Sequence, residues 1–178
     1  QGQFERIRRA LANGDSFLAN LTIATRIETS CTLLSIAERA DALYRLYVPG
    51  QFVCFSPERF VLIKPDKEGF YRIETNPMKG TIDATLPNAR ERILNDAKET
   101  AEHYTVVDLM RSDLARVGRN VRVDQFRYID EIKTLKGSLL QVSSLISATL
   151  PPNAIDTLGT IISKLLPAGS ITGAPKEA

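Results

Sequence analysis

Three short segments of the sequence use glycine, proline or charged residues in a way that ordinary turns do not require. They are residues 56–60, 76–81 and 167–176. The first contains Glu58, the second contains Lys79, and the third is rich in glycine. A carboxylic acid can protonate a leaving group, an amine can attack carbon, and a glycine-rich segment can offer backbone N–H groups to an anion. These segments are therefore the first candidates for chemistry.

Lys79 stands between Pro77-Met78 and Gly80-Thr81, on what we expect to be a short rigid loop after a strand. A loop lysine is most often a solvated surface charge. To act as a nucleophile it must lose its proton, so its pKa has to fall from about 10.4 through burial or a neighbouring cation. The environment of Lys79 therefore decides whether it can react.

Two glutamates are candidates for an acid and for a metal ligand. Glu58 follows a proline at the edge of an apolar strand. A role as a general acid is favoured only if its pocket also contains Lys79. Glu102 shares one side of a predicted helix with Val106 and Leu109. A carboxylate among apolar neighbours needs a partner, either an arginine, which is the commoner arrangement, or a hard cation such as Mg²⁺.

The remaining chemical groups exclude several classes of site. His103 is the only histidine, and we expect a packed or exposed ring rather than a catalyst. Without a cluster of cysteine and histidine, a zinc site is not expected. The glycine-rich segment lacks the Gly-Lys-Ser/Thr arrangement of a nucleotide-binding P-loop, although Pro175 suits the first turn of a helix. Binding of a carboxylate there stays open.

The elements that must position these residues are a mixture of helices and strands. Helical spacing is predicted from residue 4 to the stop at 13–15 and over 32–47, 88–117 and 154–165, and strands over 16–25, 52–55, 60–63, 71–74, 121–123 and 126–132. Residues 139–150 fit either helix or strand. Asn88 is a plausible helix N-cap, and Ile93, Ala97, Ala101 and Tyr104 form one stripe. Without regular βαβ alternation, an α+β fold is favoured.

Composition sets further bounds on function. A chain of 178 residues with 43% hydrophobic residues predicts one domain, and its apolar runs are too interrupted to span a bilayer. A net charge of +2 does not indicate a nucleic-acid partner, and the cluster Arg111, Arg116, Arg119 and Arg122 is expected to be a solvated face. Two cysteines and the lack of a signal sequence favour a soluble protein in the reducing cytoplasm.

Taken together, five ordered motifs resemble those of the chorismate-utilising enzymes. They are Ser56-Pro57-Glu58-Arg59-Phe60, Pro77-Met78-Lys79-Gly80-Thr81, Ala101-Glu102-His103, Asp108-Leu109-Met110-Arg111-Ser112-Asp113-Leu114 and Gly169-Ser170-Ile171-Thr172-Gly173-Ala174-Pro175-Lys176. No single motif suffices, but their order and spacing make the match specific. The resemblance implies an α+β fold in which antiparallel β-sheets pack as a sandwich with flanking helices.

The residue before Gly80-Thr81 separates branches of this family. Anthranilate synthases carry alanine there, whereas aminodeoxychorismate synthases carry lysine, as this chain does. The resemblance implies that Lys79 attacks C2 of chorismate with loss of the C4 hydroxyl, after which ammonia enters at C4. It also implies that Glu58 is the general acid and that Glu102 is one ligand of an Mg²⁺ ion that holds the ring carboxylate.

Substrate contacts follow from the same resemblance. The glycine-rich segment would bind a substrate carboxylate through backbone N–H groups, at positions Gly169, Ser170, Thr172 and Gly173. Asn20 falls where the family has a pocket asparagine, although the matching motif is short. Gln141 stands where anthranilate synthases have a histidine, which again disfavours that activity.

The family's catalytic domain continues beyond the Gly-Ala-Pro-Lys motif with a second metal-binding glutamate and further substrate contacts. We therefore expect residues 1–178 to be the N-terminal and middle part of a chorismate-binding domain, C-terminally incomplete and inactive alone. The resemblance implies chorismate and ammonia as substrates, a glutamine amidotransferase subunit as partner, and a role in p-aminobenzoate and folate biosynthesis. Two alternatives stay open, an anthranilate synthase component I and a noncatalytic chorismate-binding or interaction fragment.

Overall fold

The computed structural model describes residues 2–56, 58–134, 137–174 and 176. The chain forms two compact units. The larger unit consists of Gln1–Leu21 and Phe60–Ala178, and the smaller unit consists of Thr22–Arg59. Among the residues described, no helix combines the length and apolar character that crossing a bilayer requires.

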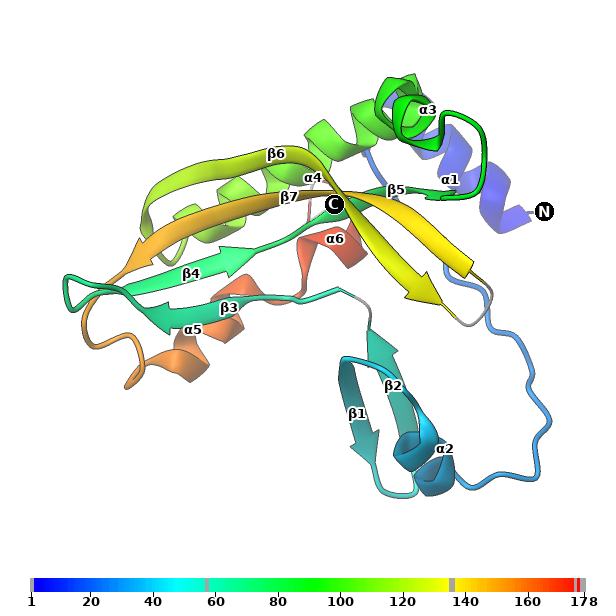
Figure 1. Cartoon of the computed structure of the whole chain (residues 1–178), viewed down its shortest axis with the longest axis horizontal. Helices are drawn as coiled ribbons and strands as arrows, with labels where there is room; N and C mark the ends of the chain where they lie inside the picture. The colour runs from blue at the N-terminus through cyan, green and yellow to red at the C-terminus, as the bar shows by residue number, and fades with distance from the viewer. Residues whose placement is uncertain (1, 57, 135–136, 175, 177–178) are drawn as a thin grey trace. The chain divides into compact units, whose positions relative to one another are not determined.

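The larger unit is an antiparallel sheet with flanking helices (Figure 1). Its helices are α1 (Gly2–Asn13), α3 (Ala89–Asn95), α4 (Ala97–Ala115), α5 (Leu158–Leu165) and α6 (Gly169–Thr172), and its strands are β3 (Leu62–Pro65), β4 (Tyr71–Thr75), β5 (Met78–Asp83), β6 (Arg119–Thr134) and β7 (Gly137–Leu150). The long strand β7 pairs with β6 along one edge. Along its other edge it pairs first with β5 and then with β4, and β3 pairs with the outer side of β4. Strands β4 and β5 therefore follow one another along the same edge of β7.

One face of this sheet packs against α4 and α5 to form the hydrophobic core. Side chains in strands alternate between faces, so Ile146, Ala148 and Leu150 of β7 share the face that meets the helices. They pack with apolar residues of β4, α4 and α5, namely Ile73, Val106, Val107, Met110, Leu114, Ile161 and Leu165. Removal of this apolar surface from water stabilises the position of α4 on the sheet.

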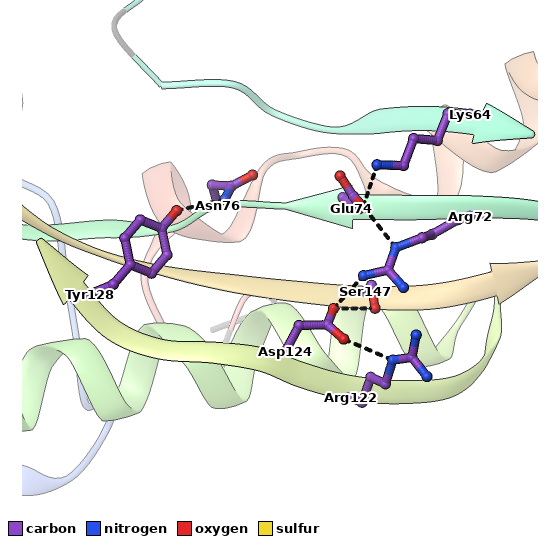
Figure 2. Close-up of polar contacts among 8 residues, drawn as sticks. All are labelled: Lys64, Arg72, Glu74, Asn76, Arg122, Asp124, Tyr128 and Ser147. Carbon is purple, nitrogen blue, oxygen red and sulfur yellow. Dashed lines mark hydrogen bonds and ion pairs between the residues drawn. The ribbon is translucent and has the colours of Figure 1, made fainter. Parts of the chain in front are cut away.

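The opposite face of the sheet carries a network of ion pairs (Figure 2). Buried Glu74 accepts hydrogen bonds from Lys64 Nζ at 2.8 Å and from Arg72 Nε at 2.7 Å. Asp124 of β6 accepts from Arg72, Arg122 and Ser147, which extends the network across the sheet. Burial would raise the pKa of Glu74, but the hydrogen bonds and charges of Lys64 and Arg72 together lower it. The network thus links β3, β4, β7 and β6 laterally.

The smaller unit contains a short helix and a β-hairpin. Its elements are α2 (Leu33–Arg39), β1 (Tyr44–Val48) and β2 (Phe52–Ser56). Thr32 caps α2 by accepting a hydrogen bond from the amide of Ser35 at 3.1 Å. The hairpin turns at Gly50, whose φ of 71° favours glycine. Its residues that the structure describes are all at least partly exposed, and an isolated two-stranded hairpin is only marginally stable.

Two predicted elements in the N-terminal third are wrong. Residues 16–25 do not form a strand, because their only ladder contact within the described chain is a single bridge between Leu18 and Ala174. The helix predicted over 32–47 ends at Arg39, and Tyr44–Val48 is strand β1. The aromatic and β-branched residues of that segment pair with β2, so tertiary pairing overrides the helical spacing.

The helix predicted over 88–117 is interrupted at Asp96. The Asp96 carboxylate accepts a hydrogen bond from the amide of Glu99 at 2.9 Å and so begins α4 as a separate helix. Asn88 has a left-handed backbone without a side-chain capping bond, and Tyr104 is exposed rather than part of a buried stripe. Residues 139–150 belong to a strand because three other strands pair with β7.

Candidate active site

Lys79 lies within strand β5, and the prediction of a loop is wrong. Met78 pairs with Ser143 and Thr81 with Gln141, so one extra residue of β5 is accommodated between these pairs as a bulge. Gly80 has a φ of 87°, which favours glycine, and a side chain there would reach Glu99 of α4. The glycine that suggested a turn therefore forms a bulge that brings the partly buried Lys79 close to α4.

Ser144 connects the start of β5 to two other elements. Its amide donates to the carbonyl of Pro77 at 3.1 Å, just before Lys79 in sequence. Its hydroxyl oxygen accepts a hydrogen bond from the amide of Arg127 at 3.0 Å and lies 2.7 Å from Nε2 of His103 on α4. Because the amide is a donor, the hydroxyl proton is available to Nε2 of a neutral ring. Ser144 thus holds β5, β6 and α4 in a fixed relation.

His103 is a packed ring, which is one of the two arrangements that the sequence left open. It is 1% exposed, and burial lowers its pKa to about 4, helped by the positive charge of Arg127. The backbone of Lys79 opposes this fall, whereas the Lys79 charge contributes to it. Both effects require Lys79 to lie close to His103. The structure therefore brings the predicted nucleophile to the helical segment that carries Glu102.

Glu102 forms an ion pair, but its partner is not the arginine that was expected. Lys98, one turn earlier on α4, places Nζ 2.9 Å from the Glu102 carboxylate. The Glu102 side chain is 29% exposed and that of Lys98 is 73% exposed. Hydrogen bonds to Glu102 and then to Glu99 raise the pKa of Lys98. An exposed pair of this kind is weak, so the carboxylate remains accessible to another cation.

The accessible carboxylate of Glu102 fits one position in a magnesium site. Among the residues described, no group of three or more histidine, cysteine, aspartate or glutamate side chains could hold a metal. Mg²⁺ commonly uses only one or two protein carboxylates and completes its shell with water and substrate oxygens. Glu102 could therefore supply one ligand, and its metal-binding role stays a prediction.

Asn20 and the glycine-rich segment come together in the structure. The side-chain amide of Asn20 donates to the carbonyl of Ile171 at 2.6 Å. The amide of Ala174 donates to the carbonyl of Leu18 at 2.9 Å, and a side chain at Gly173 would collide with the Leu18 backbone. Two segments that are far apart in sequence thus form one surface from the predicted substrate-binding residues.

The glycine-rich segment contains helix α6 rather than an open loop. The amide of Thr172 donates to Ala168 and that of Gly173 to Gly169, at 3.2 and 3.4 Å. Gly169 and Ser170 are in the first turn, where amides have no acceptor within the helix. Ser170 is partly exposed there, whereas Gly169 is buried against α4, so of the four predicted positions Ser170 retains the geometry to present an N–H group. Contact with a substrate stays a prediction for all four.

Glu58 lies in the smaller unit within a local turn. The Ser56 hydroxyl donates to the carbonyl of Glu58 at 2.8 Å and accepts from its amide at 3.2 Å. These bonds fix the backbone of a partly buried glutamate. Pro57 and Pro175, which complete two of the motifs, lie outside the described residues. The role of Glu58 as an acid stays a prediction.

Surface hollows of the larger unit lie elsewhere. One of about 340 Å³ is lined by residues that include Lys67, Arg72 and Arg122. Another of about 870 Å³ lies by the end of α4 and is lined by residues that include Arg116 and Arg119. Neither is lined by Lys79, Glu102 or Asn20. The candidate residues of the larger unit are instead gathered along α4 and at the Asn20–α6 surface.

Sequence reasoning missed several positioning residues. Ser144 and Arg127 have no distinctive sequence pattern, and Arg127 was only part of a predicted strand. Asp113 and Lys176 belong to two of the five motifs, yet the structure shows that they form a buried ion pair. Their opposite charges were the only available signal, because 63 residues separate them.

The family is given by comparison with known proteins. The family model described as chorismate binding enzyme matches residues 1–178, and the chain belongs to this family. The predicted family is therefore confirmed, and so is the mixed fold of antiparallel sheets with flanking helices.

Individual relatives differ in activity. The chain is 50% identical to an uncharacterized PabA-like protein of Pasteurella multocida, over 99% of the chain and 53% of that protein. It is 32% identical to the aminodeoxychorismate synthase component 1 of Bacillus subtilis, over 97% of the chain and 37% of that protein. It is also 32% identical to the anthranilate synthase component 1 of Methanothermobacter thermautotrophicus, over 98% of the chain and 38% of that protein. The chain thus spans about half the length of the first relative, and overall identity does not choose between the two activities.

Proposed function

We propose that the protein containing this chain aminates chorismate at C4 to give 4-amino-4-deoxychorismate, for p-aminobenzoate and folate biosynthesis. The observation that carries the proposal is Lys79 in the β5 bulge, close to His103 on α4. A partly buried lysine beside the helix that bears Glu102 suits a nucleophile next to a metal-bound substrate. The family resemblance associates lysine at this position with amination rather than with anthranilate formation.

The proposed reaction has two displacements. The neutral Lys79 amine attacks C2 of chorismate, both ring double bonds shift, and the C4–O bond breaks as Glu58 protonates the departing hydroxyl to water. Ammonia then attacks C4, both double bonds shift back, and the C2–N bond to Lys79 breaks to release the neutral amine. The new C4 ammonium group loses one proton to the Glu58 carboxylate, which restores the acid. The sum is chorismate plus ammonia giving 4-amino-4-deoxychorismate plus water. A glutamine amidotransferase subunit is the proposed source of ammonia.

The remaining residues would hold the substrate. Glu102 would ligate Mg²⁺, which when bound supplies positive charge to the ring carboxylate. Asn20 and the first turn of α6 would position the substrate through hydrogen bonds. Their mutual contact supports this role, because it gathers polar groups from both ends of the larger unit.

The test uses the complete natural polypeptide with chorismate, Mg²⁺ and ammonium, and mass spectrometry of the products. We expect 4-amino-4-deoxychorismate from the wild type and a loss of roughly 100-fold or more in Lys79→Ala. The matched control is Lys98→Ala, which removes an exposed lysine from the same region. Amination at the wild-type rate by Lys79→Ala would refute the nucleophilic role.

Anthranilate synthesis is the second candidate, because the identity to an anthranilate synthase is also 32%. Anthranilate formation releases pyruvate, whereas 4-amino-4-deoxychorismate keeps the enolpyruvyl group. Pyruvate in step with product would therefore favour the second candidate. Calorimetric binding of chorismate without any product would instead indicate a noncatalytic chorismate-binding protein.

A further inference from the structure

Two buried side chains of opposite charge join helix α4 to the segment that follows helix α6. Lys176 Nζ donates to both carboxylate oxygens of Asp113, at 2.9 and 2.8 Å, and to the carbonyl of Leu165 at 2.7 Å. The side chains of Lys176 and Asp113 are 7% and 10% exposed. An ammonium group has three protons, so these three acceptors use its full donor capacity. Lys176 therefore has no proton left with which to bind a substrate.

Helix α6 and the residues after it contact two other parts of the larger unit, helix α4 and the segment of Leu18 and Asn20. Gly169, its first residue, approaches α4 so closely that an added methyl group would lie 2.5 Å from Met110 and 2.8 Å from Leu109. On the other side, the hydrogen bonds of Asn20 and Leu18 hold Ile171 and Ala174. The position of α6 on α4 thus determines where Asn20 and the first turn of α6 lie.

A buried ion pair is a poor source of stability, because desolvation offsets much of the attraction. Its three hydrogen bonds are nevertheless directional, so they favour one distance and one orientation of the partners. Apolar side chains of similar size would fill the same space without hydrogen bonds of fixed direction. The Asp113–Lys176 pair is therefore suited to fixing the position of the segment after α6 relative to α4.

We propose that Asp113 and Lys176 are positioning residues that hold the Asn20–α6 surface in register with Glu102. Asp113 and Glu102 lie on the same helix, eleven residues or about 16 Å apart. One rigid helix would thus relate the carboxylate-binding surface to the metal-binding carboxylate. This inference rests on the proposed function, and it adds two residues that act through α6 rather than on the substrate.

The test compares two double variants of the complete natural polypeptide. Asp113→Asn with Lys176→Met removes both buried charges, so neither is left unpaired. We expect the KM for chorismate to rise on the order of tenfold with kcat within about twofold, as for lost uniform binding. The control is Asp108→Asn with Arg111→Met, which removes an exposed pair of 3.0 Å from the same helix and should leave both constants unchanged.

Hydrogen exchange without chorismate gives an independent measurement. We expect the amides of Thr172, Gly173 and Ala174 to exchange faster in the Asp113/Lys176 double variant, with those of β7 unchanged. A purely structural role would lower the folded fraction and accelerate exchange throughout, without changing KM. If KM or the exchange of α6 stays at the wild-type value, the positioning role is overturned.

The same measurements separate this inference from the proposed function. A wild-type protein that does not aminate chorismate would refute the proposed function. The exchange comparison would then decide alone whether the ion pair holds α6.

Discussion

Glu102 and Asp113 are two carboxylates on one helix with ion pairs of nearly equal length. The Glu102–Lys98 distance is 2.9 Å and the Asp113–Lys176 distance is 2.8 Å. Their surroundings differ, because the side chains of Glu102 and Lys98 are 29% and 73% exposed, whereas those of Asp113 and Lys176 are 10% and 7% exposed. The same kind of lysine–carboxylate ion pair therefore occurs once exposed to solvent and once buried.

The comparison teaches that burial, rather than distance, decides what an ion pair can do. Water screens an exposed pair, and the two side chains can separate at little cost. A buried pair cannot separate, because each charge would be left without a partner. Glu102 can thus exchange Lys98 for another cation, whereas Asp113 is fixed to Lys176.

The largest expected effect is the loss of stability in Asp113→Asn. The variant leaves the Lys176 ammonium buried without a counter-charge, which costs roughly 3–5 kcal/mol. Urea unfolding of the variant and the wild type would measure the difference. Glu102→Gln is the matched control, and an equal loss in both variants would contradict the comparison.

The next effect is on activity in Glu102→Gln. If Glu102 ligates Mg²⁺, amination of chorismate should fall roughly 100-fold or more, since even residues that only orient metal ligands cost 10–100-fold. The melting temperature should stay within about 2 °C, because an exposed pair contributes little. Steady-state rates over a magnesium titration would measure the loss of activity, and a thermal melting curve would measure the melting temperature. A variant with full activity at every magnesium concentration would exclude the metal-binding role.

His103 sharpens the comparison because it follows Glu102 directly but is buried. Its pKa is about 4 in the folded chain and 6.5 in the unfolded chain, so the unfolded state binds the extra proton between these values. Stability should therefore fall as pH decreases from 6.5 to about 4, by at most about 1.4 kcal/mol per pH unit. We expect the free energy of unfolding, measured across this pH range, to lose this dependence on pH in His103→Gln. Ser144→Ala keeps the histidine and should retain the slope.

The smallest effect is expected from Lys98→Met. Removal of the exposed lysine should leave thermal unfolding unchanged and lower the magnesium concentration for half-maximal activity by roughly two- to fivefold. Both readouts come from a melting curve and a magnesium titration. A large drop in melting temperature would mean that the Glu102–Lys98 pair is structural, as the Asp113–Lys176 pair is.

Local patterns predicted several elements correctly. The first helix ends before Gly14, which has a φ of 80°, and the residues around 52–55 and 71–74 are strands, as predicted. Errors occurred where a distant segment decided the outcome. The segment 44–48 has helical spacing but pairs with β2, and the segment 16–25 has strand character but meets only Ala174.

The candidate site shows the same division. Residue types and their order indicated Lys79, Glu102, Asn20 and the glycine-rich segment, because each motif is local. Sequence could not predict that Gly80 forms a bulge, because the bulge depends on the register with β7. The pairing of Lys98 with Glu102 was within reach of the sequence, because the two residues are four apart on one predicted helix.

The sequence by itself determined the family, the composition of the motifs and the identity of the chemical groups. These properties reside in single residues and short segments, so they do not need a fold. Only the tertiary structure decided which charges are buried, which groups are neighbours, and which ion pairs can open. Burial and long-range contact depend on the whole chain, and the free energy of a charge depends on both. Glu102 and Asp113 are alike as carboxylates in the sequence, and they differ because the fold buries one of them.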